Sequence, residues 1–222
     1  MRYHRGLLQG DTRMTPRNLL LAALLAVPGA AIAQAMPPPA EFYFDTDSHA
    51  TRPILVLEET GEPAMQKLLA IIERDPRARA EAAQLAHMAM QAGRAEIGRN
   101  LYQRALDGLS QNNVLWRPVM WNYGWDLYRA GDAQGALTQW HALLTSRGLT
   151  ATWMPQTLAL ALWSVDRKDE AVKWYAAAVR SEPDQWRTSS RYAQLLPDWR
   201  ESERATLDEV RAAWAENPPS WP

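Results

Sequence analysis

The chain has 222 residues, of which 47% are apolar, and its formal net charge is −1. This length is sufficient for one domain of ordinary size, and the balanced charge gives no indication of a nucleic-acid partner. The sequence contains no cysteine, which excludes disulfides, thiolate metal sites and lipid attachment through cysteine.

The first 35 residues have the pattern of a secretory signal peptide. Met14 is the better start, because a basic Arg17 then precedes the apolar run 19–27. Pro28 and Gly29 end that run, and small residues follow. An uncleaved membrane anchor is the alternative, but the run is shorter than the ~20 residues that a span needs. We therefore expect no stable membrane span after the signal is removed.

Cleavage is expected after Ala33 or Ala35, where small residues alternate. Residues 1–35 contain four arginines and one aspartate, so the remaining chain has a formal charge near −4. The product is expected to be exported, and in a Gram-negative cell it would be periplasmic or secreted.

Residues 36–62 differ in character from the rest of the chain. Three prolines at 37–39 form a stiff spacer, and residues 42–44 and 54–57 show strand-like or irregular content without helical phase. This stretch is interpreted as an extended, Pro-rich N-terminal arm that lies on the first helices. Within it Asp45, Asp47 and His49 form a D-x-D-x-H pattern. Such a pattern can bind a metal, but a solvated turn is the favoured interpretation.

Residues 117–150 predict an antiparallel pair of helices. Met120, Tyr123 and Leu127 recur at helical spacing, a turn follows at Gly131, and Ala136 begins a second apolar stripe. The same pattern recurs at residues 79–112 and 152–185. A single pair cannot bury both apolar faces, so recurrence at a fixed period predicts stacked pairs.

The repeats resemble those of the tetratricopeptide repeat (TPR) family. Its signature is W-x2-L-G-x2-Y, then A-x3-F and a closing proline, over about 34 residues. The pattern is matched by Ala171, Tyr175, Ala178 and Pro183 in one copy. In the preceding copy it is matched by Tyr123, Gly124, Ala136 and Trp140. The leading tryptophan is replaced by Met120, Pro155 or Ala82, and the closing proline by Gly148 or Ser110 in two copies.

The remaining residues extend the pattern at both ends. Residues 63–78 are in phase with the second half of a repeat, and Asp75 and Pro76 are expected to start the following helix. Residues 186–219 are expected to form a C-terminal repeat or cap. Pro197 would shorten its first helix, and a capping box with Asp198 and Glu201 would open its last.

The predicted fold is therefore all-α. The resemblance implies a right-handed superhelical solenoid of antiparallel helix pairs over residues 63–219, preceded by the extended N-terminal arm. It would contain about three TPR-like repeats, an N-terminal half repeat and a C-terminal capping helix pair.

The resemblance also implies a concave groove lined by the first helix of each pair. The residues that occupy the groove-facing positions are Trp121, Trp125, Tyr128, Arg129, Trp153, Gln156, Trp163, His87 and Arg187. Tryptophan and tyrosine are frequent anchors at binding surfaces. An aromatic stripe at helical spacing is also typical of side chains that the chain itself buries, and the sequence leaves both interpretations open.

The predicted function is a non-catalytic scaffold or adaptor. No G-x-S-x-G, H-E-x-x-H or phosphate-binding glycine loop is present, so neither an enzyme nor a cofactor or metal site is expected. The groove would bind a peptide or another protein of the cell envelope. Two alternatives are a glycan-binding module that uses the same aromatic residues, and self-association through this surface.

Overall fold

The computed structural model describes residues 35–220, and within them it is all-helical, with ten helices and no strand. The predicted signal peptide lies outside the described residues, apart from Ala35. The helices are α1 (Gly61–Arg74), α2 (Arg79–Gln91), α3 (Ala95–Leu106), α4 (Trp116–Arg129), α5 (Ala133–Arg147), α6 (Met154–Ser164), α7 (Lys168–Ser181), α8 (Pro183–Trp186), α9 (Tyr192–Leu195) and α10 (Glu201–Glu216).

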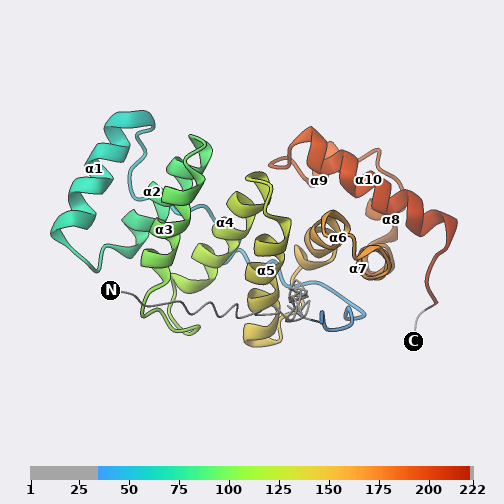
Figure 1. Ribbon diagram of the computed structural model, residues 1–222. Coiled ribbons are helices and arrows are strands. Elements are labelled where there is room, and N and C mark those ends of the chain that lie inside the picture. Colours follow the sequence, from blue (N-terminus) through green and yellow to red (C-terminus); the bar gives the residue numbers. More distant parts are fainter. Residues whose placement is uncertain (1–34, 221–222) are drawn as a thin grey trace, which may run out of the picture. The chain divides into compact units, whose positions relative to one another are not determined.

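Helices that are neighbours in the chain pack as pairs. The closest packing joins α2 to α3, α4 to α5 and α6 to α7, and α1 lies against α2 (Figure 1). At the C-terminal end α10 packs against α6 and α7. Among residues 35–220, no helix combines the length and the apolar character that a membrane crossing requires.

Gly124 explains the close approach of α4 to α5. A Cβ atom at this position would lie 2.3 Å from Nε1 of Trp140, so any larger residue would displace that buried indole. The turn between the two helices contains Gly131, whose φ of 88° suits glycine. The Asp132 carboxylate then accepts a hydrogen bond of 2.8 Å from the backbone N–H of Gly135 at the start of α5.

Two predicted helix starts are wrong by a few residues. Asp75 accepts a bond from the N–H of Arg77 and forms a turn, so α2 begins only at Arg79. At the start of α10 the capping carboxylate belongs to Glu203, which accepts a 2.7 Å bond from the N–H of Arg200. The predicted carboxylates of Asp198 and Glu201 do not have this role, because the helix begins three residues after Asp198.

The region after α7 contains no long helix until α10. Two four-residue helices, α8 and α9, are separated by residues 187–191, and the chain then turns through Pro197. Buried Trp186 and Tyr192 pack at a ring-centroid distance of 6.0 Å. The Tyr175 hydroxyl of α7 lies 2.6 Å from both the Trp186 carbonyl oxygen and the Tyr192 hydroxyl. These contacts fix the two short helices on α7.

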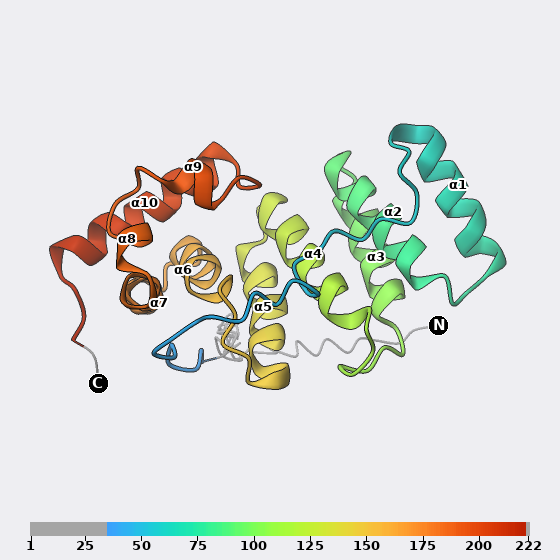
Figure 2. The ribbon, with the colours of Figure 1, turned by 180° about the vertical axis from the view of Figure 1, so that it is seen from behind.

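Residues 35–60, here called the N-terminal segment, contain no helix (Figure 2). The ring of Tyr43 packs on Trp174 of α7 at 6.1 Å between centroids. Asp45 forms an isolated parallel bridge with Ala151, just before α6. Further along, Asn122 of α4 donates a 2.9 Å bond to the Arg52 carbonyl oxygen.

Asp47 corrects the expectation of a solvated turn at the D-x-D-x-H pattern. Asp45 and His49 are exposed, but Asp47 is only 8% exposed because its carboxylate is bonded to the guanidinium of Arg117. Trp153 also donates a 3.0 Å bond from Nε1 to this carboxylate. Among residues 35–220, no group of three or more histidine, aspartate or glutamate side chains is placed to hold a metal ion.

Candidate functional site

One opening on α2 and α4, the first helices of two pairs, is a cavity of about 590 Å³, here called the groove cavity. α4 forms its floor with Trp121, Trp125 and Arg129. Thr51 and Pro53 of the N-terminal segment also line it, and so do residues 195–199 after α8. The cavity therefore brings together parts of the chain that are far apart in sequence.

Three tryptophans that line the groove cavity belong to one cluster of packed rings. The ring of Trp125 lies 5.8 Å from that of Trp121, 5.1 Å from that of Trp199 and 5.0 Å from that of Trp140, all edge to face. Such edge-to-face pairs are favourable because the positive edge of one ring meets the negative face of the other. Trp125 is 8% exposed, whereas Trp121 is only partly buried. The accessible aromatic surface of the floor is therefore mainly that of Trp121.

Arg129 links this cluster to α10. Its guanidinium carbon lies 4.9 Å from the centroid of the Trp125 ring, which is a cation–π distance. Its Nε donates a 2.8 Å bond to the buried carboxylate of Glu203, and Nη2 donates to the Asp198 carbonyl oxygen at 2.9 Å. A guanidinium held at several points keeps a fixed orientation. The edge of the cavity is therefore rigid at this end.

A buried carboxylate orients the histidine at the other end of the cavity. Asp126 accepts a 2.6 Å bond from the Tyr102 hydroxyl, and His87 Nδ1 lies 2.9 Å from the same oxygen. Burial raises the pKa of Tyr102 well above its ordinary value, and the adjacent Asp126 carboxylate raises it further. The His87 side chain remains 45% exposed. This arrangement presents an oriented imidazole to the groove cavity.

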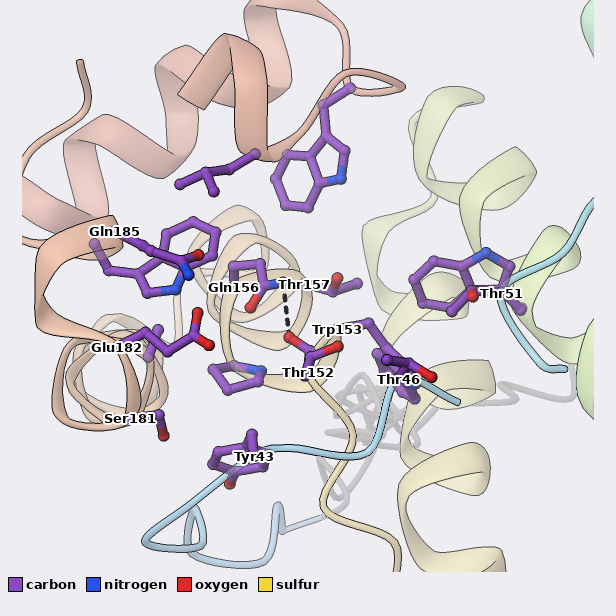
Figure 3. Close-up of a pocket in the computed structure, with 16 residues that line it drawn as sticks. Tyr43, Thr46, Thr51, Thr152, Trp153, Gln156, Thr157, Ser181, Glu182 and Gln185 are labelled. Carbon is purple, nitrogen blue, oxygen red and sulfur yellow. Dashed lines mark hydrogen bonds between the residues drawn. The ribbon is translucent and has the colours of Figure 1, made fainter. Parts of the chain in front are cut away.

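A second cavity of about 320 Å³, here called the polar cavity, adjoins the first. Thr51, Trp121, Leu195 and Trp199 line both. The polar cavity is enclosed by the start of α6, the end of α7, α8 and the N-terminal segment. Figure 3 shows Gln156 and Thr157 between the side chains of Glu182 and Gln185 and those of Thr46 and Thr51.

The two cavities contain most of the residues predicted to line a groove. Those at the groove cavity are His87, Trp121, Trp125 and Arg129. Those at the polar cavity are Trp121, Trp153 and Gln156.

Tyr128, Trp163 and Arg187 line neither cavity. The Tyr128 hydroxyl lies 2.9 Å from Ser164 Oγ. Trp163 Nε1 donates a 2.9 Å bond to Glu209 of α10, and Lys168 Nζ lies 3.7 Å from its ring centroid. Arg187 is exposed after α8, because the chain there turns instead of continuing a first helix.

Sequence reasoning missed Asp126, Trp199 and the two residues Gln84 and Asn122 that contact the N-terminal segment. Asp126 lies on the predicted first helix, but its partners lie 24 to 39 residues earlier in the chain. Trp199 follows Pro197 in a segment without helical phase. Each of these residues is identified by a distant contact, and periodicity alone carries no information on such contacts.

No protein-family model, curated protein or solved structure matches this chain. The resemblance to tetratricopeptide repeats therefore stays a prediction. The candidate site rests on the two cavities and their lining residues alone.

Proposed function

We propose that this chain is a non-catalytic scaffold of the cell envelope, which binds an extended segment of another protein in the groove cavity. The observation that supports this most is the way in which α2 and α4, the first helices of two pairs, bind the chain's own N-terminal segment. These helices contact an extended backbone through side-chain amides, and the aromatic cavity lies directly beside that segment.

Gln84 of α2 forms three bonds with the N-terminal segment. Its Oε1 accepts from the N–H groups of Val56 and Leu57 at 2.8 and 2.9 Å, and its Nε2 donates to the Leu57 carbonyl oxygen at 2.6 Å. Asn122 of α4 forms the equivalent contact with the Arg52 carbonyl oxygen. Bonds to backbone groups hold an extended chain whatever its side chains are, as in other modes of peptide recognition.

Gln84 and Asn122 occupy the same place in two successive predicted repeats, 79–112 and 117–150. Repeated placement of one type of side chain is what a groove for an extended chain requires, because an extended chain offers its backbone groups at regular intervals. Residues at the same position of two repeats thus both bond to the backbone of one extended segment. This regularity favours a peptide ligand over a ligand of irregular shape.

The groove cavity supplies anchoring surface for the partner's side chains. Trp121 is partly exposed at its floor, while His87 and Arg129 supply polar groups at its edges. Tryptophan anchors in well-packed surroundings contribute a large share of binding energy at protein interfaces. We therefore propose a partner segment with an apolar or aromatic side chain that packs on Trp121.

The resemblance to tetratricopeptide repeats supports the same function. In this proposal the pairs α2–α3, α4–α5 and α6–α7 are three repeats of a right-handed solenoid, with α1 as a half repeat and α10 as part of the terminal cap. Residues 1–35 would direct export and be removed, which would place the scaffold in the periplasm or outside the cell.

The test is affinity capture from an envelope extract with residues 36–222, beside the variants Trp121→Ala and Trp163→Ala. Both variants remove one partly buried tryptophan, but only Trp121 lines the groove cavity. Thermal melts of all three proteins establish that each is folded.

The proposal predicts that one partner is retained by the wild type and by Trp163→Ala but lost by folded Trp121→Ala. Truncation of an anchor of this kind should weaken binding by about 2 kcal/mol or more. Equal capture by both variants would contradict a role for the groove cavity. A concentration-dependent mass of the purified chain, abolished by Trp121→Ala, would instead indicate self-association.

A further inference from the structure

The polar cavity has a lining unlike that of the groove cavity. Hydroxyl and amide side chains alternate with aromatic rings around it (Figure 3). The polar side chains that matter here are Thr46, Thr152, Thr157, Gln156 and Gln185. Its rings include Tyr43, Trp153 and Trp186.

Several of these polar groups have unused hydrogen-bonding capacity. Gln156 donates from Nε2 to the Thr152 carbonyl oxygen at 2.9 Å, which leaves its Oε1 available as an acceptor. The side chains of Thr157 and Gln185 also line this cavity, and neither forms a hydrogen bond with another of the residues 35–220. A ligand in the cavity can therefore bond to both without breaking an existing contact.

The cavity also has a defined charge. Among the residues that line it, Glu182 is the only charged side chain, and no lysine, arginine or histidine is present. A carboxylate, sulfate or phosphate group on a ligand would be repelled by the negative charge of Glu182, with no cation in the lining to offset the repulsion. The cost of removing water from that anionic group would also not be compensated. A neutral ligand that donates hydrogen bonds to a carboxylate meets no such penalty.

A pyranose ring has the matching chemistry. Its C–H face is apolar and can pack on an indole, while its rim carries hydroxyl groups that both donate and accept, as threonine and glutamine side chains require. The volume of about 320 Å³ lies at the small end of the roughly 300–1,000 Å³ typical of small-molecule sites. We infer that the polar cavity binds a neutral sugar unit of a glycan. Gln185 and Thr157 bond to its hydroxyls in this site, and Glu182 accepts from them.

This inference goes beyond the proposed scaffold function, because it assigns a second ligand to a different cavity. It also specifies the glycan alternative: the sugar site is the polar cavity, and the expected sugar carries no charge. The two sites share Trp121 and Trp199, so variants at those positions cannot separate them. Gln185 and Thr157 line the polar cavity alone.

The test is isothermal titration of residues 36–222 with maltotriose, cellotriose, chitotriose in its fully N-acetylated form, and trigalacturonic acid. The first three are neutral, and the fourth carries a carboxylate on each unit. The variants are Gln185→Leu and Thr157→Val, which nearly preserve side-chain volume. The matched control is Gln194→Leu, because Gln194 is an exposed glutamine that lines neither cavity.

At least one neutral trisaccharide is expected to bind, and trigalacturonic acid is not. Loss of one neutral hydrogen bond should weaken binding by about twofold to tenfold in Gln185→Leu and in Thr157→Val, with Gln194→Leu unchanged. The inference is overturned if no neutral trisaccharide binds at millimolar concentration, if trigalacturonic acid binds as well as the neutral sugars, or if neither variant weakens binding. Failure here leaves the capture experiment on Trp121 unaffected, so the two proposals fail separately.

Discussion

Arg117 of α4 and Asp47 of the N-terminal segment form an ion pair that is buried at both ends, although the two residues lie 70 positions apart. Arg117 Nη1 also donates a 2.7 Å bond to Ser146 Oγ of α5, and Trp153 Nε1 donates to Asp47. One buried polar network thus joins the N-terminal segment to α4, α5 and the start of α6. Thr51 and Pro53 of the N-terminal segment line the groove cavity, and this network holds that segment in place.

Replacing Asp47 by alanine should destabilise the chain strongly. The substitution leaves the Arg117 guanidinium buried without its counter-ion, which typically costs about 3–5 kcal/mol. Chemical denaturation measures the change in the free energy of unfolding, with Ser48→Ala at the exposed neighbouring position as control. The double variant Asp47→Leu/Arg117→Met, which removes both charges, should recover much of the loss. A loss below about 1 kcal/mol in Asp47→Ala would show that the pair is not buried in solution.

Replacing Trp125 by alanine should also lower stability, by about 3–5 kcal/mol, because its ring is enclosed by Trp121, Trp140 and Trp199. Trp163 lies against Lys168 and Glu209 and is partly exposed, so Trp163→Ala should cost clearly less. Thermal and chemical unfolding of the two variants provide the comparison. Equal losses would mean that Trp125 is not part of the core.

The sequence predicts the helical class because apolar side chains recur at helical spacing in residues 79–185. It also predicts that the tryptophans on the second helices, Trp140, Trp174 and Trp214, pack against the chain. Exposures of 0% and 2% confirm this for the first two, whereas Trp214 is only partly buried, with its ring 6.1 Å from that of Tyr175. Periodicity identifies the face of a helix on which a residue lies. It does not identify what covers that face.

Trp125 and Trp163 illustrate this limit. Both occupy groove-facing positions by resemblance, but Trp199 packs on the first, while the second bonds to Glu209 of α10. The covering residues lie 46 to 74 positions further along the chain. The two cavities likewise depend on the path of residues 187–200, where the expected first helix is broken into short turns.

Loss of the Glu203 carboxylate should loosen α10. Glu203 is buried and bonds to Arg129 through both of its oxygens, at 2.8 and 3.2 Å. Bonds to charged groups contribute about 2 kcal/mol each, so Glu203→Gln should lower the free energy of unfolding by about that amount. Amide hydrogen exchange in residues 201–216 should accelerate, and Glu201→Gln at an exposed position should change nothing. Unchanged exchange in Glu203→Gln would contradict the role of this pair.

Stability should fall at alkaline pH because of Tyr175. Burial raises the pKa of Tyr175 to about 12 in the folded chain, from its ordinary 10.0. The unfolded chain therefore loses the tyrosine proton first. The stabilisation is complete below pH 10 and is lost as the pH rises toward 12. Burial also raises the pKa of Tyr192, which acts in the same direction.

The measurement is the free energy of unfolding across this pH range for wild type and Tyr175→Phe. The variant lacks one shifted group, so its stability should decline less steeply with pH. Ultraviolet absorbance titration follows tyrosinate formation directly. Parallel pH dependence in the two proteins would exclude Tyr175 as a cause.

The most direct test of the central proposal is photo-crosslinking in intact cells from position 198, at the edge of the groove cavity. Asp198 is exposed and lines that cavity, whereas Lys173 of α7 is also exposed but lines neither cavity, so it is the matched control. A scaffold that holds a partner in the groove predicts one partner crosslinked from position 198, absent from position 173 and lost when Trp121→Ala is added. The same crosslinks from both positions, or a crosslink from position 198 that survives Trp121→Ala, would contradict binding in the groove.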